Sequence, residues 1–317
     1  MSLKTPMKQL VIAENASLGG HIVAMTFGLC GLLLVLPNPD FIANLPPFGL
    51  KAFELSMGQG GVGYIVLGAI AVALFLYRTL GLRSCLTFMV PSIVLSLSSE
   101  LLGTSTGFPF GAYHYLTGLG YKVAGLVPFT IPLSWFYMGA VCYVLARNGL
   151  ERLGLRGWLR GVMAIALGAV FLTSWDLVLD PAMSQTSFPF WEFEELGEFF
   201  GMPYRNLSGW WGTGVVFMAV ASLLWSSEPL NLKRSQLTLP LMTYIVNFAF
   251  GAVITVTSLD HGFWVPTALS VLTGVVPVIA CWWIAGDRPS IEAVGKGVMP
   301  DTTGPAMASS LKPVATK

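Results

Sequence analysis

Charged side chains are scarce in this sequence, and their scarcity argues against an ordinary soluble protein. Only 10% of the 317 residues are Asp, Glu, Lys or Arg, whereas an average soluble domain is roughly 25% charged. The net charge is +1, and the basic residues are scattered through short loops and both ends of the chain instead of forming a stripe. We therefore expect no nucleic-acid partner.

Histidine and cysteine are also few, which argues against most metal sites. The three histidines are well separated, and the four cysteines fall within apolar runs at no metal-like spacing. The sequence contains no Walker loop, no HExxH motif and no nucleophile triad with its histidine. Acid–base chemistry remains, and we expect neither a metal nor a cofactor.

Long apolar runs dominate the sequence instead. Hydrophobic residues make up 54% of the chain and the mean hydropathy is +0.70. Eight runs approach the length that crosses a bilayer; they cover residues 18–36, 60–77, 84–102, 125–146, 160–180, 209–226, 238–256 and 264–285. We predict an all-α, polytopic transmembrane helical bundle of about eight spans, an integral membrane protein of the bacterial plasma membrane.

Basic residues are segregated between the two sides that this alternation defines. One side, which includes both termini, holds 14 of the 17 Lys and Arg, and the other holds Lys51, Lys122 and Arg205. Because cytoplasmic loops retain positive charge, the N- and C-termini are predicted to be cytoplasmic. The predicted organisation is a polar N-terminal segment (1–17), a transmembrane catalytic domain (18–286) and a disordered C-terminal tail (287–317).

Acidic residues inside the predicted spans are the sharpest functional signals. Placing Glu100 or Asp176 in a span costs a few kcal/mol on insertion scales. Asp176 and Asp180, in TSWDLVLDP, are four residues apart and so lie about 40° apart on one helical face. Two carboxylates so close disfavour double ionisation, which leaves one as a neutral acid. The alternative is that these residues are solvated or capping groups in the headgroup region, with Asp180 merely ending a helix before Pro181.

Aromatic residues accompany these carboxylates. In GFPFGAYHY, an extended chain places Tyr113 and Tyr115 on one side and His114 on the other. Trp135 and Trp210 offer π faces that stabilise a cation. An aromatic belt at the membrane interface is the alternative for these side chains.

Two later segments border the same predicted membrane face. WEFEELGEFF, which begins at Trp191, predicts an amphipathic helix lying on the membrane surface. FGMPYRNLSGWW follows, and there Arg205 is a candidate to pair with Asp176 or Asp180, while Asn206 adds a neutral hydrogen-bonding group.

Glu100 followed by TGFPFGAYHY, then WDLVLDP and then FGMPYRNLSGWW, resembles the membrane-embedded carotenoid 1,2-hydratase family, over roughly residues 20–285. Members include bisanhydrobacterioruberin hydratases and γ-carotene 1′-hydroxylating enzymes. The resemblance implies addition of water across the terminal C1=C2 double bond of an acyclic carotenoid such as γ-carotene or lycopene, without a redox cofactor. The implied partners are a bilayer carotenoid, water, membrane lipid and other carotenoid-biosynthesis enzymes.

We hypothesise that one of Asp176 and Asp180 donates the proton, the other tunes its acidity, and Glu100 orients the attacking water or is itself the acid. The expected substrate-binding residues are Tyr113, Tyr115, Trp135, Arg205, Asn206 and Trp210. The competing hypotheses are a membrane lycopene cyclase-like enzyme, a proton-coupled transporter with an acidic relay and a non-catalytic carotenoid-binding protein.

Overall fold

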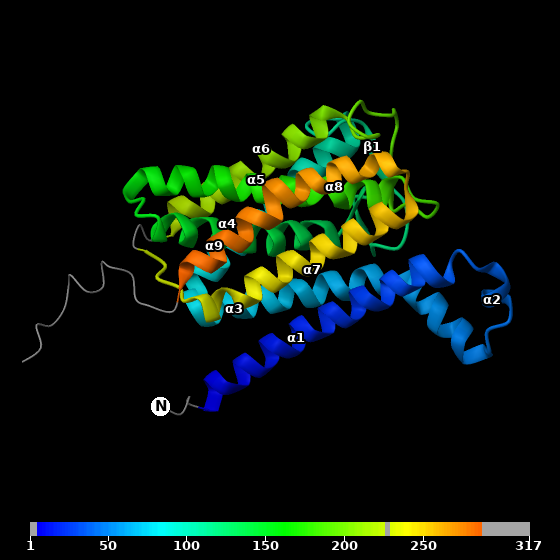
Figure 1. The fold of residues 1–317 in the computed structure, drawn as a ribbon, viewed down its shortest axis with the longest axis horizontal. Coiled ribbons are helices and arrows are strands. Elements are labelled where there is room, and N and C mark those ends of the chain that lie inside the picture. Colours follow the sequence, from blue (N-terminus) through cyan, green and yellow to red (C-terminus); the bar gives the residue numbers. More distant parts are fainter. Residues whose placement is uncertain (1–4, 226–228, 287–317) are drawn as a thin grey trace, which may run out of the picture. The chain divides into compact units, whose positions relative to one another are not determined.

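The structure, a computed structural model, describes residues 5–225 and 229–286, and most of these are helical (Figure 1). The long helices are α1 (Thr5–Cys30), α3 (Pro47–Thr106), α4 (Thr130–Arg152), α5 (Gly157–Ser184), α6 (Tyr204–Leu224) and α7 (Arg234–Ser258). Shorter helical elements are η1 (Gly31–Val35), α2 (Pro39–Ala43), η2 (His261–Phe263), α8 (Trp264–Ser270), η3 (Val271–Val275) and α9 (Val276–Ala285). Helix α1 already begins within the segment predicted to be polar. The predicted tail, residues 287–317, lies outside the described residues.

Six helical segments are long and apolar enough to cross a membrane by length and composition. They are Met7–Val35, Pro47–Thr106, Gly157–Ser184, Tyr204–Leu224, Arg234–Ser258 and His261–Ala285. Many large apolar side chains on these helices are exposed, among them Val23, Val94 and Leu272. Such exposure suits a lipid environment better than water, so the structure supports an integral membrane protein.

Helix α3 is two limbs joined at a reversal. Gly81 has φ +86° and ψ 165°, a non-helical conformation that suits glycine. The Cys85 Sγ lies 3.5 Å from the Ala73 carbonyl oxygen, whereas twelve residues of straight helix would span about 18 Å. The chain therefore doubles back at Gly81, so that residues 60–77 and 84–102, predicted as separate runs, occupy two adjacent limbs.

Helix α4 forms the centre of the bundle. Every residue from Trp135 to Leu150 is buried, as expected of a helix that other helices surround. Close packing requires small residues here: a Cβ added at Gly139 would lie 2.6 Å from the Phe217 ring on α6. Near its C-terminal end α4 carries Arg147, Glu151 and Arg152, and it is not among the six apolar segments named above. A helix that other helices surround tolerates such residues because protein, not lipid, covers it.

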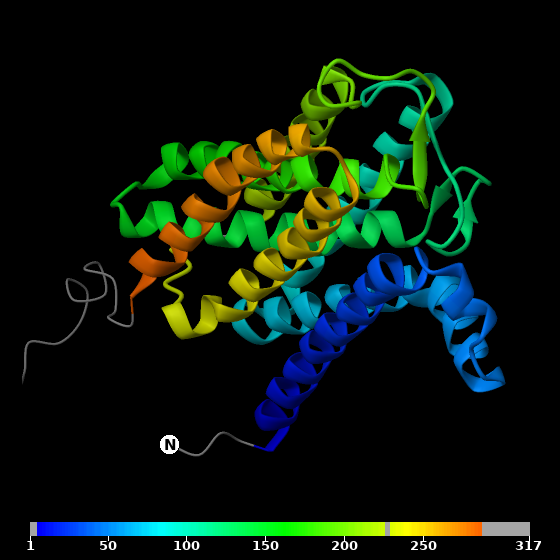
Figure 2. The same cartoon turned by 45° about the vertical axis from the view of Figure 1, so that its right-hand side comes forward.

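Short strands cover one end of the helices, and they overturn one sequence-based prediction. Strand β1 (Tyr113–Tyr115) pairs antiparallel with β4 (Trp191–Phe193), and β2 (Lys122–Val123) pairs with β3 (Val127–Pro128). The prediction of a surface helix over WEFEELGEFF was wrong, because Trp191, Glu192 and Phe193 alternate with the period of a strand and β1 supplies backbone partners. Figure 2 shows these strands together at the same end as α2.

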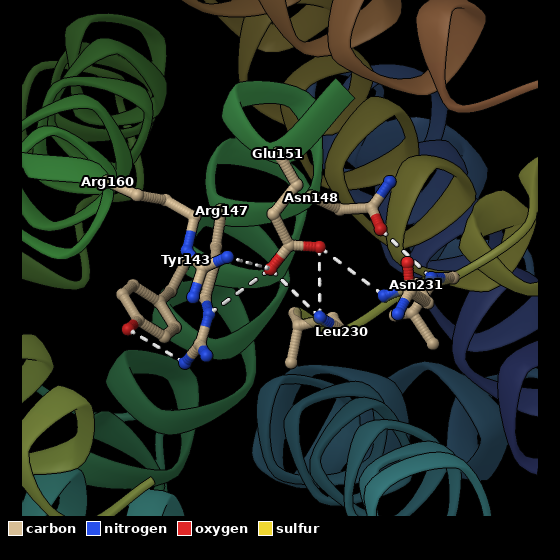
Figure 3. A network of polar contacts seen from close by, with 8 residues as sticks. Tyr143, Arg147, Asn148, Glu151, Arg160, Leu230 and Asn231 are labelled. Atoms are coloured by element: carbon tan, nitrogen blue, oxygen red, sulfur yellow. Dashed lines mark hydrogen bonds and ion pairs between the residues drawn. The ribbon is translucent and has the colours of Figure 1, made fainter. Parts of the chain in front are cut away.

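A polar cluster joins helices at the other end of α4 (Figure 3). Glu151 lies 3.5 Å from the Arg147 Nε and 3.7 Å from the Arg160 Nη1. The same carboxylate accepts hydrogen bonds from the backbone N–H of Leu230, at 2.9 Å, and of Asn231, at 3.3 Å. One buried side chain thus ties α4 and α5 to the connection between α6 and α7.

Replacing Glu151 by Ala should lower the free energy of unfolding by about 3–5 kcal/mol, because it removes a buried carboxylate shared by two buried arginines. Thermal unfolding of the purified protein in detergent measures the effect. Glu195→Ala, at an exposed glutamate, is the control and should change stability little. Equal melting temperatures for the two variants would contradict this role.

Candidate active site

Three carboxylates from two helices converge beside the strand-covered end of α4. Glu100 comes from the second limb of α3, and Asp176 and Asp180 come from α5. Beside them is a cavity of about 40 Å³, enough for a few water molecules. We call it the carboxylate cavity; its lining is Glu100, Phe110, Tyr113, Tyr115, Ile131, Ser134, Trp135, Leu179, Asp180, Trp191, Phe193, Asn206 and Trp210.

Glu100 is buried, with 4% of its surface exposed, so it is not a solvated headgroup residue. Its Oε1 accepts a hydrogen bond from the Trp135 Nε1 at 2.8 Å. Its Oε2 accepts one from the Tyr115 hydroxyl at 2.9 Å and another from the Tyr113 hydroxyl. Because an indole N–H can only donate, Oε1 is an acceptor, and the two phenols bring the donors around this carboxyl group to three.

The two tyrosines lie on one side of β1, as an extended chain requires, and His114 faces outward. Burial raises the pKa of Tyr113 and of Tyr115 well above the ordinary value, and the neighbouring Glu100 charge raises both further. Both phenols therefore keep their protons and remain donors to Glu100. His114 is exposed, with its Nε2 3.9 Å from a Glu192 oxygen, and it belongs to the outer surface.

Asp176 and Asp180 share one neutral donor. The Asn206 Nδ2, on α6, lies 3.0 Å from the Asp176 Oδ2 and 2.6 Å from the Asp180 Oδ2. The Asp180 Oδ1 accepts a second hydrogen bond, of 2.6 Å, from the Trp191 Nε1. The Asp176 Oδ1 is buried and has no hydrogen-bond partner in the described part of the chain. Both aspartates are thus buried acids, not headgroup or capping residues.

Asp180 lines the carboxylate cavity with Glu100, whereas Asp176 does not. An aromatic wall completes the cavity: the Trp135 and Trp210 rings stack with centroids 4.1 Å apart and planes 25° apart. The Trp175 ring meets Trp210 edge-on, with centroids 5.9 Å apart. The arrangement places two carboxyl groups and several π faces around a space for water.

The suggested pairing of Arg205 with an aspartate was wrong. Arg205 is exposed and makes no ion pair with Asp176 or Asp180 in the described residues, and the next residue, Asn206, takes that place. Because Asn206 is buried while Arg205 is exposed, this turn of α6 directs the amide inward. Arg205 instead lines a larger hollow of about 730 Å³. We call it the outer groove; its lining is Leu95, Ser98, Ser99, Phe108, Pro109, Arg205, Ser208, Gly209, Gly212, Thr213 and Val216.

Sequence reasoning missed Phe110, Trp175 and Trp191. The period-two pattern of Trp191, Glu192 and Phe193 was the available signal for β4 and for an inward-facing Trp191. Trp175 directly precedes Asp176, but nothing in the sequence shows that its ring meets Trp210. Among the described residues, no group of three or more His, Cys, Asp or Glu side chains could hold a metal ion.

Comparison with known proteins gives two matches. The family described as carotenoid biosynthesis protein matches residues 60–277. Bisanhydrobacterioruberin hydratase of Haloarcula japonica is 32% identical over 190 residues, which are 59% of this chain and 60% of that protein. The chain therefore aligns with about three fifths of that relative's length. No solved structure matches.

Replacing Asp176 by Asn should stabilise the protein by about 0.5–2 kcal/mol, a typical gain for relieving strain at a functional site. The variant removes one of two buried carboxylates that share a single amide and keeps an oxygen to accept from Asn206. Thermal unfolding at neutral pH measures the gain. Asp260→Asn, at an exposed position, should leave the melting temperature unchanged, and a clear loss of stability in Asp176→Asn would contradict the interpretation.

Proposed function

Because the chain belongs to the carotenoid biosynthesis protein family, we propose that it is a hydratase that adds water across the terminal C1=C2 double bond of an acyclic carotenoid end group. The proposed substrates are γ-carotene and lycopene, and no cofactor is needed. The name of the Haloarcula japonica relative supports a hydration reaction. The observation that carries the proposal is the water-sized carboxylate cavity, with acids on two walls and aromatic rings on a third.

Asp180 is the proposed acid. Two carboxylates that share one neutral amide disfavour double ionisation, so the Asp176 and Asp180 pair retains a proton. Of the two aspartates only Asp180 lines the cavity, so it delivers this proton to C2 of the alkene. The π electron pair forms the new C2–H bond, and C1 becomes a tertiary cation. Asp176 supports the reaction in two ways. It accepts from the same Asn206 amide as Asp180, and its nearby carboxylate favours the protonated form of Asp180.

Glu100 is the proposed acceptor for the attacking water. Three fixed donors hold it as a carboxylate, so it accepts one O–H of a water molecule whose oxygen bonds to C1. The proton released from that water passes to Glu100 and returns to Asp180 through the cavity water. Water is consumed and one C–OH bond is formed, with no change in redox state.

The aromatic wall has two proposed tasks. Trp135, Trp210 and Tyr113 face the cavity, and each ring over a cation contributes about 0.5–2 kcal/mol. The stacked indoles also keep bulk water away, so that the cation meets only the few waters beside Glu100.

Expression in a lycopene-producing host should yield carotenoids heavier by about 18 Da for each hydrated end, the mass of the water added across each alkene. Asp180→Asn should abolish this product, because an amide cannot donate the proton, and Glu195→Gln, at an exposed glutamate, should leave it intact. Mass-resolved pigment analysis provides the measurement. A product of unchanged mass with new rings would indicate a cyclase, and unchanged pigment would contradict catalysis.

We also propose that the chain crosses the membrane eight times, with both termini cytoplasmic. The reversal of α3 at Gly81 and the enclosed helix α4 add two crossings to the six apolar segments. Figure 1 shows successive helices running in alternate directions. The end that carries Arg83 and Arg156 would then be cytoplasmic by the positive-inside rule, and the carboxylate cavity would lie near the opposite face.

Cysteine accessibility tests this orientation. In a Cys30→Ser background, which removes the one exposed cysteine among the four, single variants Glu195→Cys and Arg83→Cys place thiols at exposed positions near opposite ends. A membrane-impermeant thiol reagent should label Glu195→Cys in intact cells and Arg83→Cys only after permeabilisation. The reverse pattern, or labelling of both in intact cells, would contradict the topology.

A further inference from the structure

The outer groove has a volume of about 730 Å³, within the range of about 300–1,000 Å³ that ligand pockets occupy. It lies between the second limb of α3 and α6. Its lining on α6 runs from Arg205 to Val216, which corresponds to about 16 Å of helix. Val94, Leu102 and Trp211 beside it are exposed, so the groove opens where lipid would contact the bundle.

The outer groove and the carboxylate cavity are built back to back from the same segments. Ser99, Pro109 and Gly209 line the groove. The residue that follows each of them, Glu100, Phe110 and Trp210, lines the cavity. The wall between the two spaces is therefore about one residue thick.

Phe110 is the central piece of this wall. It is buried, and its ring lies against Gly209 so closely that an added Cβ would come within 2.6 Å of the Phe110 Cδ1. The Phe110 ring centroid is 6.1 Å from that of Trp135 on the cavity side. Phe110 therefore lies between the groove and the cavity.

The two volumes restrict how a long hydrocarbon is accommodated. A cavity of about 40 Å³ holds a few water molecules and no polyene, so a substrate that reacts there must lie mostly outside it. The groove is the neighbouring hollow that shares a wall with the cavity. Its lining is mainly apolar or small and uncharged, apart from Arg205 at one end of α6.

We infer that the outer groove binds the linear polyene arm of the carotenoid substrate, with the end group passing Phe110 to reach the edge of the carboxylate cavity. This inference rests on the proposed function, because the occupant is the substrate of that reaction. Leu95, Val216 and Phe108 contact the hydrocarbon, and Gly212 keeps the floor of the groove low. The substrate enters sideways from the bilayer and needs no passage through water.

Gly212→Leu tests the inference, because a Cβ at Gly212 meets no atom within 4 Å. The substitution fills the groove without displacing the fold, and Gly212→Ala fills it partly. Gly19→Leu is the matched control: its Cβ also meets nothing within 4 Å, and it lies exposed on α1. Each variant is expressed in the lycopene-producing host, and both the bound carotenoid per protein and the hydrated fraction are measured.

Gly212→Leu should lower bound carotenoid and hydrated product at least fivefold, Gly212→Ala should lower them less, and Gly19→Leu should match the wild type. Wild-type levels of both in Gly212→Leu would overturn the inference. So would an unchanged pigment content combined with a changed oligomeric state on size-exclusion chromatography, since the groove would then be an interface between copies.

The two measurements separate this inference from the proposed function. If the wild type binds carotenoid without hydrating it, the hydratase proposal fails. The loss of pigment in Gly212→Leu then still shows whether the groove binds carotenoid. If the wild type hydrates lycopene and Gly212→Leu hydrates it equally well, the hydratase proposal stands and the groove is rejected. If the wild type neither binds nor hydrates, both proposals fall.

Discussion

The site depends on one constraint: three carboxylates are buried in an apolar helix bundle and are held by neutral donors. In the described residues, Glu100 is supported by two phenols and an indole, and the two aspartates by one amide and another indole. A buried polar group without a partner costs a few kcal/mol, so these donors must be fixed in place. The packing of α4, α5, α6 and the strand pair follows from that need.

The β1–β4 pair explains how donors from distant segments reach the acids. Tyr113 and Tyr115 share one face of β1 at a spacing of two, and their register with Phe193 and Trp191 places an indole beside them. The strand pair thus brings residues about 80 positions apart to Glu100 and Asp180. In a surface helix over residues 191–200, side chains would repeat every 3.6 residues instead of every two. Trp191 and Phe193 would then point in different directions, and Trp191 would lie away from Asp180.

Much of the architecture could be predicted from the sequence, because membrane insertion is a local property of each apolar run. The eight runs coincide largely with helices, although the run at 125–146 includes β3 before α4 starts at Thr130. The comparisons confirm the resemblance to the carotenoid hydratase family. The convergence of Glu100, Asp176 and Asp180 also followed from their predicted position at one membrane face. Contacts that depend on rotation about a helix axis could not be predicted: one residue turns a helix by about 100°, which decides that Asn206 faces the aspartates while Arg205 faces the groove.

The buried carboxylates at the two ends of the bundle have different partners, and this difference supports the proposed catalytic role of Asp180. Glu151, at the other end, is also buried, and it lies beside two arginines and two backbone N–H groups that stabilise its charge. An arginine in the same position at Asp180 would fix that residue as an anion and remove its proton. An amide and an indole satisfy the oxygens equally well in geometry, yet they leave the proton free to move. The same fold therefore pairs full charges at Glu151, which joins helices, and places neutral donors at the site where we propose that a proton is transferred.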